Sequence, residues 1–344
     1  MQKIKIGVVG LNWGLRMIED QLLKGPGSPY FEVTAVCDLD EQKADMVGKK
    51  LGLKSYSTLQ DILNDTEIST IAVFTGPAGR ANVIHQIIRA GKHVMTTKPF
   101  EVDPHAAIDV LEEAKRINKV IHMNSPSPVL SPDLQQIKSW QKQYNLGRPI
   151  AAHWQTWCSY REKSDSSWYD DPQKCPAAPI FRLGIYAIND ILRFFNRPSS
   201  VQVNFSKIFT QRPTPDNAQL TITFEDGCIA DIFASFCIED GGSYADSLIV
   251  NFERGTVYRN VGPSEDLDRR TRLQLMTRYQ NKTLIENSDF ERNLCCGAYM
   301  WDIFYRAING EKFDEISPKQ IAYGLKIIEA LRRAQSSGAT EKVE

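Results

Sequence analysis

The run Lys92-His93-Val94-Met95-Thr96-Thr97-Lys98-Pro99-Phe100 decides how the rest of this chain is interpreted. Residues 94–96 predict a short strand that ends at a lysine followed by a proline. The residue before a proline is pushed into extended geometry, so Lys98 cannot continue into a helix. Ligands of open α/β sheets bind just beyond the carboxyl ends of the strands. Lys98 is therefore either a reactive group at such a site or a solvated lysine at a strand end.

A glycine turn follows the first predicted strand. Residues 4–9 predict a buried parallel strand, Gly10-Leu11-Asn12-Trp13-Gly14 a turn, and residues 15–24 a helix. Glycines let the backbone approach a pyrophosphate at the helix N-terminus. Compared with G-x-G-x-x-G from Gly10, Asn12 takes the second glycine position, and asparagine tolerates left-handed backbone well. The residues expected to contact a dinucleotide are Gly10, Asn12, Trp13 and Gly14.

An acid follows the next predicted strand, which spans residues 31–37. Asp38 in that position can bond ribose hydroxyls and repel a 2′-phosphate, which favours NAD without excluding NADP. The alternative is that Asp38-Leu39-Asp40 only caps the helix beginning near Glu41. Both interpretations hold if Asp40 caps the helix and Asp38 faces the ribose.

The alternation of strands and helices continues to residue 124. This spacing predicts a doubly wound parallel sheet, an α/β Rossmann domain over residues 1–124. The further predicted elements are a short helix capped by Thr58, strand 69–74, the turn Thr75-Gly76-Pro77, helix 79–90, a helix starting at Asp103-Pro104, and strand 119–123.

The order of these motifs resembles the Gfo/Idh/MocA oxidoreductases, the family of glucose-fructose oxidoreductase and inositol dehydrogenase. Family members usually read Ala-Gly-Lys-His-Val, a few residues, then Glu-Lys-Pro; this chain has Ala90-Gly91-Lys92-His93-Val94 and then Lys98-Pro99, with Thr97 in place of the glutamate. The resemblance implies a nicotinamide cofactor, with Lys98 beside the reacting carbon and Pro99 in a cis bond. It also implies cofactor contacts from Thr75, Gly76 and Pro77.

Clustered Ser and Pro in Ser125-Pro126-Ser127-Pro128 predict a domain boundary after Asn124. Residues 125–344 predict an α+β substrate domain with a large, mostly antiparallel open sheet. Polar and apolar residues alternate over residues 220–224, so one sheet face is packed and the other open. The resemblance implies that this open face pairs subunits into homodimers or homotetramers. The other predicted elements are helix 134–144, strands 150–158, 201–209, 218–224, 229–236 and 248–252, the hairpin turn Glu225-Asp226-Gly227, and a charged loop over 265–272.

The chemistry of the second domain is expected on residues 181–193. On a helix, Arg182, Tyr186 and Asn189 fall at i, i+4 and i+7 and share one face, which is either a substrate site or a solvated face. The family motif here is roughly Asp-x-Gly-x-His-x-x-Asp, and Gly184 matches its glycine. Arg182 replaces the first aspartate, Tyr186 the histidine and Asn189 the last aspartate. Members similar to glucose-fructose oxidoreductase use a tyrosine at this position as the acid/base.

Together these residues predict hydride transfer between nicotinamide and a secondary alcohol or carbonyl of a sugar, sugar acid or cyclitol. Lys98 and Tyr186 are the expected catalytic residues: Tyr186 moves the hydroxyl proton, and Lys98 lowers its pKa from the usual value of about 10. Arg182 is expected to bind a substrate carboxylate or phosphate. The other expected substrate contacts are Asn124, Trp168 and Asn189, with core packing as the alternative for the tryptophan.

Composition narrows the class of protein. A chain of 344 residues with net charge -1, 24% charged and 42% hydrophobic residues fits a two-domain globular protein and argues against a nucleic-acid partner. No apolar run reaches the roughly 20 residues of a membrane helix, and a strand at Ile4 leaves no room for a signal peptide. Seven scattered cysteines favour reduced thiols in the cytoplasm, and no metal site is predicted. Two alternatives stay open: a non-catalytic dinucleotide-dependent sugar sensor, and an imine or enone reductase on the same scaffold.

Overall fold

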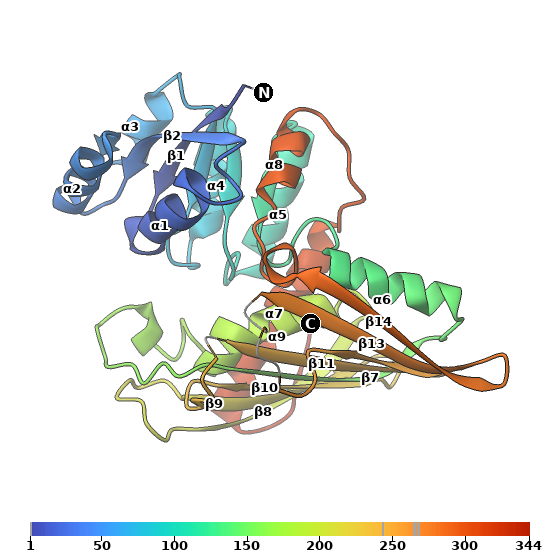
Figure 1. Cartoon of the computed structure of the whole chain (residues 1–344). Helices are drawn as coiled ribbons and strands as arrows, with labels where there is room; N and C mark the ends of the chain where they lie inside the picture. The colour runs from blue at the N-terminus through green and yellow to red at the C-terminus, as the bar shows by residue number, and fades with distance from the viewer. Residues whose placement is uncertain (1, 243, 264–265, 267–268) are drawn as a thin grey trace. The chain divides into compact units, whose positions relative to one another are not determined.

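The computed structural model describes residues 2–242, 244–263, 266 and 269–344, which form two compact units (Figure 1). Unit 1 comprises Met1–Val129 and Tyr299–Pro318, and unit 2 comprises Leu130–Ala298 and Lys319–Glu344. The predicted boundary after Asn124 lies close to the observed one after Val129. The segment Tyr299–Pro318, which the sequence placed in the second domain, belongs to unit 1.

Unit 1 contains a six-stranded parallel sheet in the order β3-β2-β1-β4-β5-β6. Its central strands are almost entirely buried, as expected where helices cover both faces of a parallel sheet. The predicted Rossmann domain is confirmed. Its strands are β1 (Ile4–Val9), β2 (Phe31–Cys37), β3 (Lys54–Tyr56), β4 (Thr70–Val73), β5 (His93–Thr96) and β6 (Ile121–Met123). Its helices are α1 (Leu11–Met17), a π-helical turn (Ile18–Leu23), α2 (Glu41–Leu51), α3 (Leu59–Asn64), α4 (Arg80–Arg89), α5 (Pro104–Arg116) and α8 (Trp301–Ile308).

Three helices of unit 1 begin at the predicted caps. The Asp40 side chain accepts a hydrogen bond from the backbone N–H of Lys43, and Thr58 accepts one from that of Asp61. Asp103 caps α5 in the same way, with a proline at the first helical position. The predicted helix over residues 15–24 is different, because α1 begins directly after Gly10 and continues as a π-helical turn.

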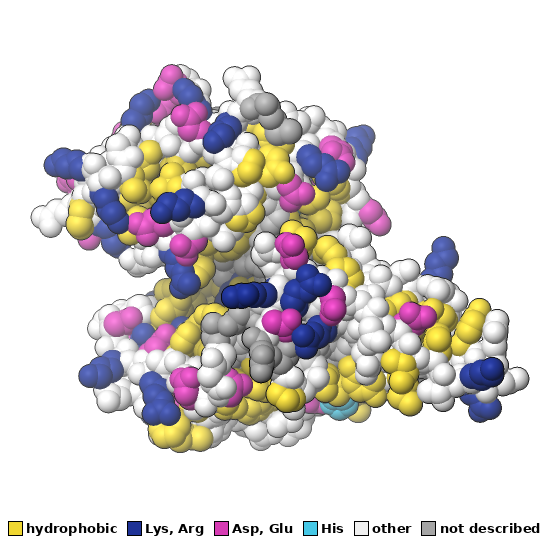
Figure 2. Space-filling view, viewed as in Figure 1, with side chains coloured by type: hydrophobic (Ala, Val, Ile, Leu, Met, Phe, Trp, Pro, Cys, Tyr) yellow, Lys and Arg dark blue, Asp and Glu magenta, His cyan; other side chains and the backbone are white. Residues whose placement is uncertain are grey.

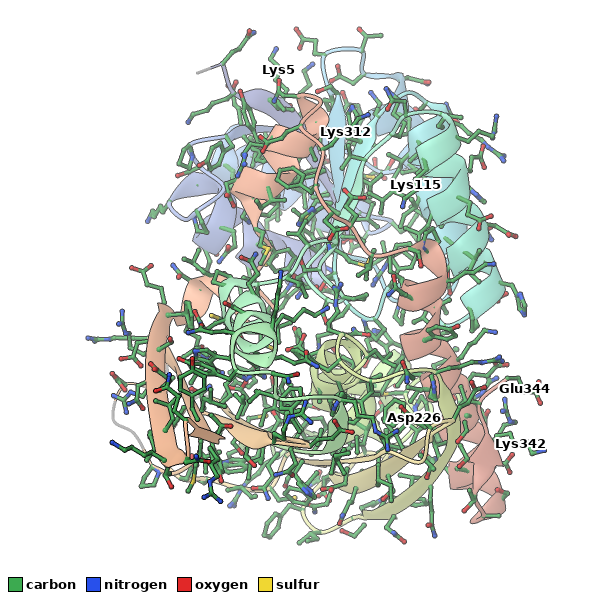
Figure 3. All side chains as sticks on the ribbon, turned by 90° about the vertical axis from the view of Figure 1, so that its right-hand side faces the viewer. Lys5, Lys115, Asp226, Lys312, Lys342 and Glu344 are labelled. Atoms are coloured by element: carbon green, nitrogen blue, oxygen red, sulfur yellow. The ribbon has the colours of Figure 1, made fainter. Side chains whose placement is uncertain are left out.

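Aromatic residues explain why a late segment of the chain belongs to unit 1. Trp301 and Phe304 in α8 are buried, and each ring centroid lies 5.4 Å from that of Phe31 in β2. Large aromatic side chains lose much apolar exposure on such packing, which holds α8 against the sheet. Figure 3 shows Lys312, which follows α8, together with Lys5 and Lys115, and all three belong to unit 1.

Unit 2 contains a nine-stranded sheet in the order β14-β13-β12-β11-β7-β10-β9-β8-β15. Every neighbouring pair is antiparallel except β7 and β10, so the predicted mostly antiparallel sheet is confirmed. Helices lie along one face of this sheet (Figure 1). They are α6 (Pro132–Gln143), a π-helical turn (Ile180–Gly184), α7 (Ile185–Ile191) and α9 (Pro318–Ser337), with short 3-10 turns at Trp168–Asp170 and Arg292–Leu294.

The strands of unit 2 include several that the sequence did not predict. β13 begins at Arg270, inside the run expected to be a charged loop; residues 265, 267 and 268 of that run lie outside the described residues. Figure 2 shows hydrophobic side chains on the surface of unit 2. Met276 and Ile285, which are paired neighbours in β13 and β14, are both exposed. The strands are β7 (Pro149–Trp157), β8 (Pro198–Ser206), β9 (Asn217–Phe224), β10 (Ile229–Ser235), β11 (Ala245–Phe252), β12 (Gly255–Arg259), β13 (Arg270–Tyr279), β14 (Lys282–Glu291) and β15 (Glu341–Lys342).

No helix in the described ranges combines the length and apolar character needed to cross a membrane.

Candidate functional site

The glycine turn of unit 1 has the close backbone approach that the sequence predicted. Gly10 has a φ of 87°, and a Cβ there would lie 3.0 Å from the backbone of Phe74 and Thr75. Only glycine fits, and the turn Thr75-Gly76-Pro77 therefore starts beside Gly10. A Cβ on Gly14 would lie 2.9 Å from Val8, so this glycine lets α1 pack against β1.

Asp38 lies at the carboxyl end of β2 and braces this turn. Its Oδ2 accepts a hydrogen bond from the Leu11 backbone N–H at 2.7 Å, and its Oδ1 accepts one from the Asp40 N–H at 3.1 Å. Asp40 caps α2, as predicted, so the two acids have separate structural roles. Each Asp38 oxygen retains a further lone pair, because a carboxylate offers about four acceptor sites.

Lys43 in α2 is a neighbour of the turn that the sequence did not suggest. Its Nζ donates to Asn12 Oδ1 at 2.5 Å and lies 3.8 Å from Asp38 Oδ2. Because an ammonium group only donates, it binds the carbonyl oxygen of the Asn12 amide and orients the NH₂ group away from itself. Lys43 lies in the first turn of α2, after the Asp40 cap, where a lysine is usually solvated. The sequence therefore offered no reason to select it.

The lysine loop after β5 is held by its backbone. The Lys98-Pro99 peptide bond is cis, as the resemblance implied. The Lys98 backbone N–H donates to Asn124 Oδ1 at 3.0 Å, and the Asn124 side chain is buried. Asn124, expected to contact substrate, therefore fixes the backbone of Lys98.

Arg80, a second support of the loop, gave no signal in the sequence because an arginine in a first helical turn is usually solvated. It is only 2% exposed, and it donates to the backbone carbonyls of Thr75, Thr97 (2.6 Å) and Pro99. Burial lowers the pKa of Arg80 to about 10, and the buried carboxylate of Glu101 acts against that shift. Arg80 therefore stays charged at neutral pH and joins the turn after β4 to the lysine loop.

In unit 2, the segment expected to be one helix changes its winding. Residues Ile180–Gly184 form a π-helical turn, and α7 begins at Ile185. A π turn closes i→i+5 hydrogen bonds, so the i, i+4, i+7 spacing no longer defines one face. Arg182 and Asn189 are buried, whereas Tyr186 is half-buried.

Arg182 is paired inside unit 2. Its Nη1 and Nη2 donate to the two carboxylate oxygens of Glu162 at 2.6 and 2.8 Å. Its guanidinium lies over the rings of Tyr169, Phe236 and Tyr160, 3.9, 4.7 and 5.1 Å from their centroids. The hypothesis that Arg182 binds a substrate anion loses its basis, because Glu162 neutralises the charge and the rings enclose it.

Glu162 also pairs with a second buried arginine, Arg212. Glu162 Oε2 accepts from Arg212 Nε at 2.9 Å, and Arg212 also pairs with Asp165 and Asp170 at 2.7 and 2.8 Å. These contacts fasten the segment before α7 to the connection between β8 and β9. Trp168 lies in this segment, half-buried, with its ring edge-on to Phe181 at 6.0 Å, which is a packing contact.

Two glycines make room for the remaining predicted residues. A Cβ on Gly297 would lie 2.9 Å from the Tyr186 ring, and Gly297 has a φ of 80°. A Cβ on Gly324 in α9 would lie 2.5 Å from Asn189 Oδ1. The positions of Tyr186 and Asn189 thus depend on glycines more than a hundred residues away in the chain, which no local motif indicates.

Among the described residues, no group of three or more His, Cys, Asp or Glu side chains is arranged to hold a metal ion. All seven cysteines are free thiols.

Comparison with known proteins shows the family. Residues 4–125 match the model of the GFO/IDH/MocA oxidoreductase family, NAD-binding Rossmann fold, and residues 134–258 match the GFO/IDH/MocA C-terminal domain. The chain is 22% identical over 148 residues to inositol 2-dehydrogenase/D-chiro-inositol 3-dehydrogenase of Lactiplantibacillus plantarum, covering 42% of each chain. It is 22% identical over 267 residues to galactose 1-dehydrogenase of Pseudomonas fluorescens, covering 76% of this chain and 80% of that one.

The match to several curated relatives is partial: it spans 42%, 57% and 62% of the length of three of them. Among solved structures, GenD2 from gentamicin A biosynthesis in complex with NAD has a TM-score of 0.77 at 17% identity, covering 100% of this chain and 97% of that one. That likeness supports the fold.

Proposed function

Because the chain belongs to the GFO/IDH/MocA family of oxidoreductases, we propose that it transfers a hydride between a nicotinamide cofactor and a secondary alcohol or carbonyl of a sugar, sugar acid or cyclitol. One observation carries the proposal: Lys98 is fixed at the carboxyl end of β5 by Asn124, while Arg80 ties the same loop to the turn beside Gly10. Inositol and galactose dehydrogenases among the relatives support the substrate class.

The residues of the glycine turn fit a dinucleotide. The absent Cβ of Gly10 leaves the backbone approachable, and Asp38 lies at the strand end where an acid bonds ribose hydroxyls. A bound nicotinamide supplies the hydride chemistry, and the protein supplies orientation and proton handling. We assign the cofactor as NAD, since Asp38 and Asp40 both carry negative charge near the ribose position, with NADP as the alternative.

Lys98 and Tyr186 are the residues we assign to proton handling. The Lys98 ammonium would stabilise negative charge on the substrate oxygen, and the Tyr186 hydroxyl would give or take its proton. Asn189, three residues after Tyr186 and buried close to Gly324, would orient the substrate-facing part of α7.

The test uses Lys98→Met and Tyr186→Phe, with the exposed Lys115→Met on α5 as a matched control. Each site variant should lose at least about a hundredfold in turnover, since positioned acid–base groups contribute about 10²–10⁴. NADH binding, followed by tryptophan quenching, should persist in both. Turnover is measured on a panel of inositols, aldoses and sugar acids.

Near-normal turnover in both site variants would remove the assignment. NADH binding without turnover on any panel member would favour the sugar-sensor alternative. Turnover confined to imines or enones would favour the reductase alternative.

We further propose a homodimer or homotetramer formed through the open face of the unit 2 sheet, located in the cytoplasm. Exposed Ile229, Met276 and Ile285 on its strands support the interface, and seven free thiols support a reducing compartment. Sedimentation velocity on Met276→Lys should show a smaller species than the unmodified chain. An unchanged sedimentation coefficient would contradict this interface.

A further inference from the structure

Tyr299 touches both the glycine turn and the lysine loop of unit 1. The Trp13 indole Nε1–H donates to the Tyr299 hydroxyl at 3.1 Å. The Tyr299 hydroxyl donates to Thr97 Oγ1 at 3.0 Å. Trp13 lies in the first turn of α1, directly after Gly10, and Thr97 directly precedes Lys98. One phenol therefore joins the two regions assigned to the cofactor and to Lys98.

The direction of the hydrogen bond between Trp13 and Tyr299 is fixed by chemistry. An indole nitrogen has a proton and no available lone pair, so Tyr299 must accept from Trp13. The same hydroxyl bonds Thr97 Oγ1 on its other side. Removing the hydroxyl of Tyr299 therefore deletes its contacts with Trp13 and Thr97 at once.

The ring of Tyr299 is held independently of its hydroxyl. It lies edge-on to Phe74, 6.1 Å between centroids, and stacks on Trp301 at 5.9 Å. Phe74 follows β4 and borders Gly10, while Trp301 is part of the core of unit 1. The substitution Tyr299→Phe keeps these ring contacts and deletes only the two hydrogen bonds.

We propose that Tyr299 is a positioning residue that couples the glycine turn to the lysine loop, so that a ligand ordering Gly10–Gly14 also orders Thr97 and Lys98. The coupling is a property of unit 1 alone, while its use in cofactor binding rests on the proposed function.

Hydrogen–deuterium exchange of the ligand-free protein tests the coupling. Tyr299→Phe should raise amide exchange in residues 10–17 and in residues 94–100, each by about threefold to tenfold for the loss of one hydrogen bond. Thr97→Val should also raise exchange in residues 10–17, although the two segments are far apart in sequence. The matched control is Tyr305→Phe, whose hydroxyl donates instead to the Gln2 carbonyl at 3.2 Å; it should change neither segment.

ADP-ribose, which can occupy the glycine turn but has no nicotinamide ring, tests the consequence for ligand binding. In the unmodified chain it should protect residues 10–17 and also residues 94–100. In Tyr299→Phe, ADP-ribose should bind about threefold to tenfold more weakly. When bound, it should still protect the amides of residues 10–17 but no longer those of residues 94–100.

Exchange in Tyr299→Phe that equals that of the unmodified chain in either segment would overturn the coupling, as would undiminished ADP-ribose protection of residues 94–100. If ADP-ribose and NADH fail to bind the unmodified chain while the ligand-free differences hold, the coupling stands and the proposed function fails.

Discussion

Two buried arginines show how differently the two units build their sites. Arg80 in unit 1 donates only to backbone carbonyls, so it fixes the path of the chain. Arg182 in unit 2 pairs with the Glu162 carboxylate and is enclosed by aromatic rings, so it fixes side chains. Contacts to the backbone therefore fix the loops of unit 1, whereas contacts between side chains distant in the sequence fix the segment before α7 in unit 2.

Removing the buried charge of unit 1 should have the largest effect. In Arg80→Met, the backbone carbonyls of Thr75, Thr97 and Pro99 lose their donor and the buried Glu101 loses a compensating charge. We expect the free energy of unfolding to fall by about 3–5 kcal/mol, measured by urea denaturation. The control is Arg89→Met, whose exposed side chain pairs with Glu113 and should cost at most about 1 kcal/mol. Equal costs for the two variants would show that Arg80 does not support the loop.

The corresponding change in unit 2 should cost less, because the arginines there have several partners. Glu162→Gln removes the shared acceptor of Arg182 and Arg212, and Arg212 keeps Asp165 and Asp170. We expect a loss of about 2–4 kcal/mol in the free energy of unfolding. Combining Glu162→Gln with Arg182→Met should cost less than the sum of the single changes by at least about 1 kcal/mol. Additive costs would contradict a direct ion pair.

The same contrast explains how much the sequence predicted. In unit 1, strand ends, caps and glycine turns are local, so the close approach at Gly10 and the Asp40 cap could be predicted from the residues, while the cis Lys98-Pro99 bond was implied by the family resemblance. The sequence assigned residues 299–318 to the second domain, because the contact of Trp301 with Phe31 joins segments about 270 residues apart that no local pattern connects.

In unit 2, the sequence predicted the kind of sheet but not all of its strands. The sequence did not predict β13 because its first three residues, Arg270-Thr271-Arg272, end a run of charged residues that resembles a loop until the partner strand is known. Arg182 pairs with Glu162, and Gly297 and Gly324 leave the space that Tyr186 and Asn189 occupy. No periodicity within residues 181–193 contains that information.

A smaller effect should test whether Asp38 acts on the cofactor or only on the backbone. Asp38→Asn keeps an oxygen acceptor for the Leu11 N–H and removes the negative charge. The affinity ratio of NADPH to NADH should rise by about tenfold, since an acid there repels a 2′-phosphate. Lys43→Met, which removes the ammonium 3.8 Å from Asp38, should shift the ratio the other way. Fluorescence titration with both cofactors measures the ratio, and an unchanged ratio in both variants would leave Asp38 with a structural role only.

The smallest expected effect concerns a residue of the motif that identified the fold. His93 Nδ1 accepts a hydrogen bond from the Val120 backbone N–H at 3.1 Å, which only the neutral imidazole can do. Burial, with the nearby charge of Lys119, lowers the pKa of His93 to about 4. The unfolded value is about 6.5, so the unfolded chain binds the proton more tightly. The stabilisation is therefore complete above pH about 6.5 and is lost as the pH falls toward about 4.

The side-chain oxygen of His93→Asn can accept the same hydrogen bond but does not titrate. Between pH about 6.5 and about 4, we expect this variant to lose about 1 kcal/mol less free energy of unfolding than the unmodified chain. Urea denaturation at a series of pH values measures the slopes, with the exposed His105→Asn as control. The buried His122, whose pKa is also lowered to about 3 by burial, keeps part of the slope in every variant. Parallel slopes for His93→Asn and the unmodified chain would contradict the assignment. A shallower slope would assign to His93 a role in stabilising the parallel sheet. Lys92 has the same kind of role, because its Nζ donates to the backbone carbonyls of Asp65 and Ile68.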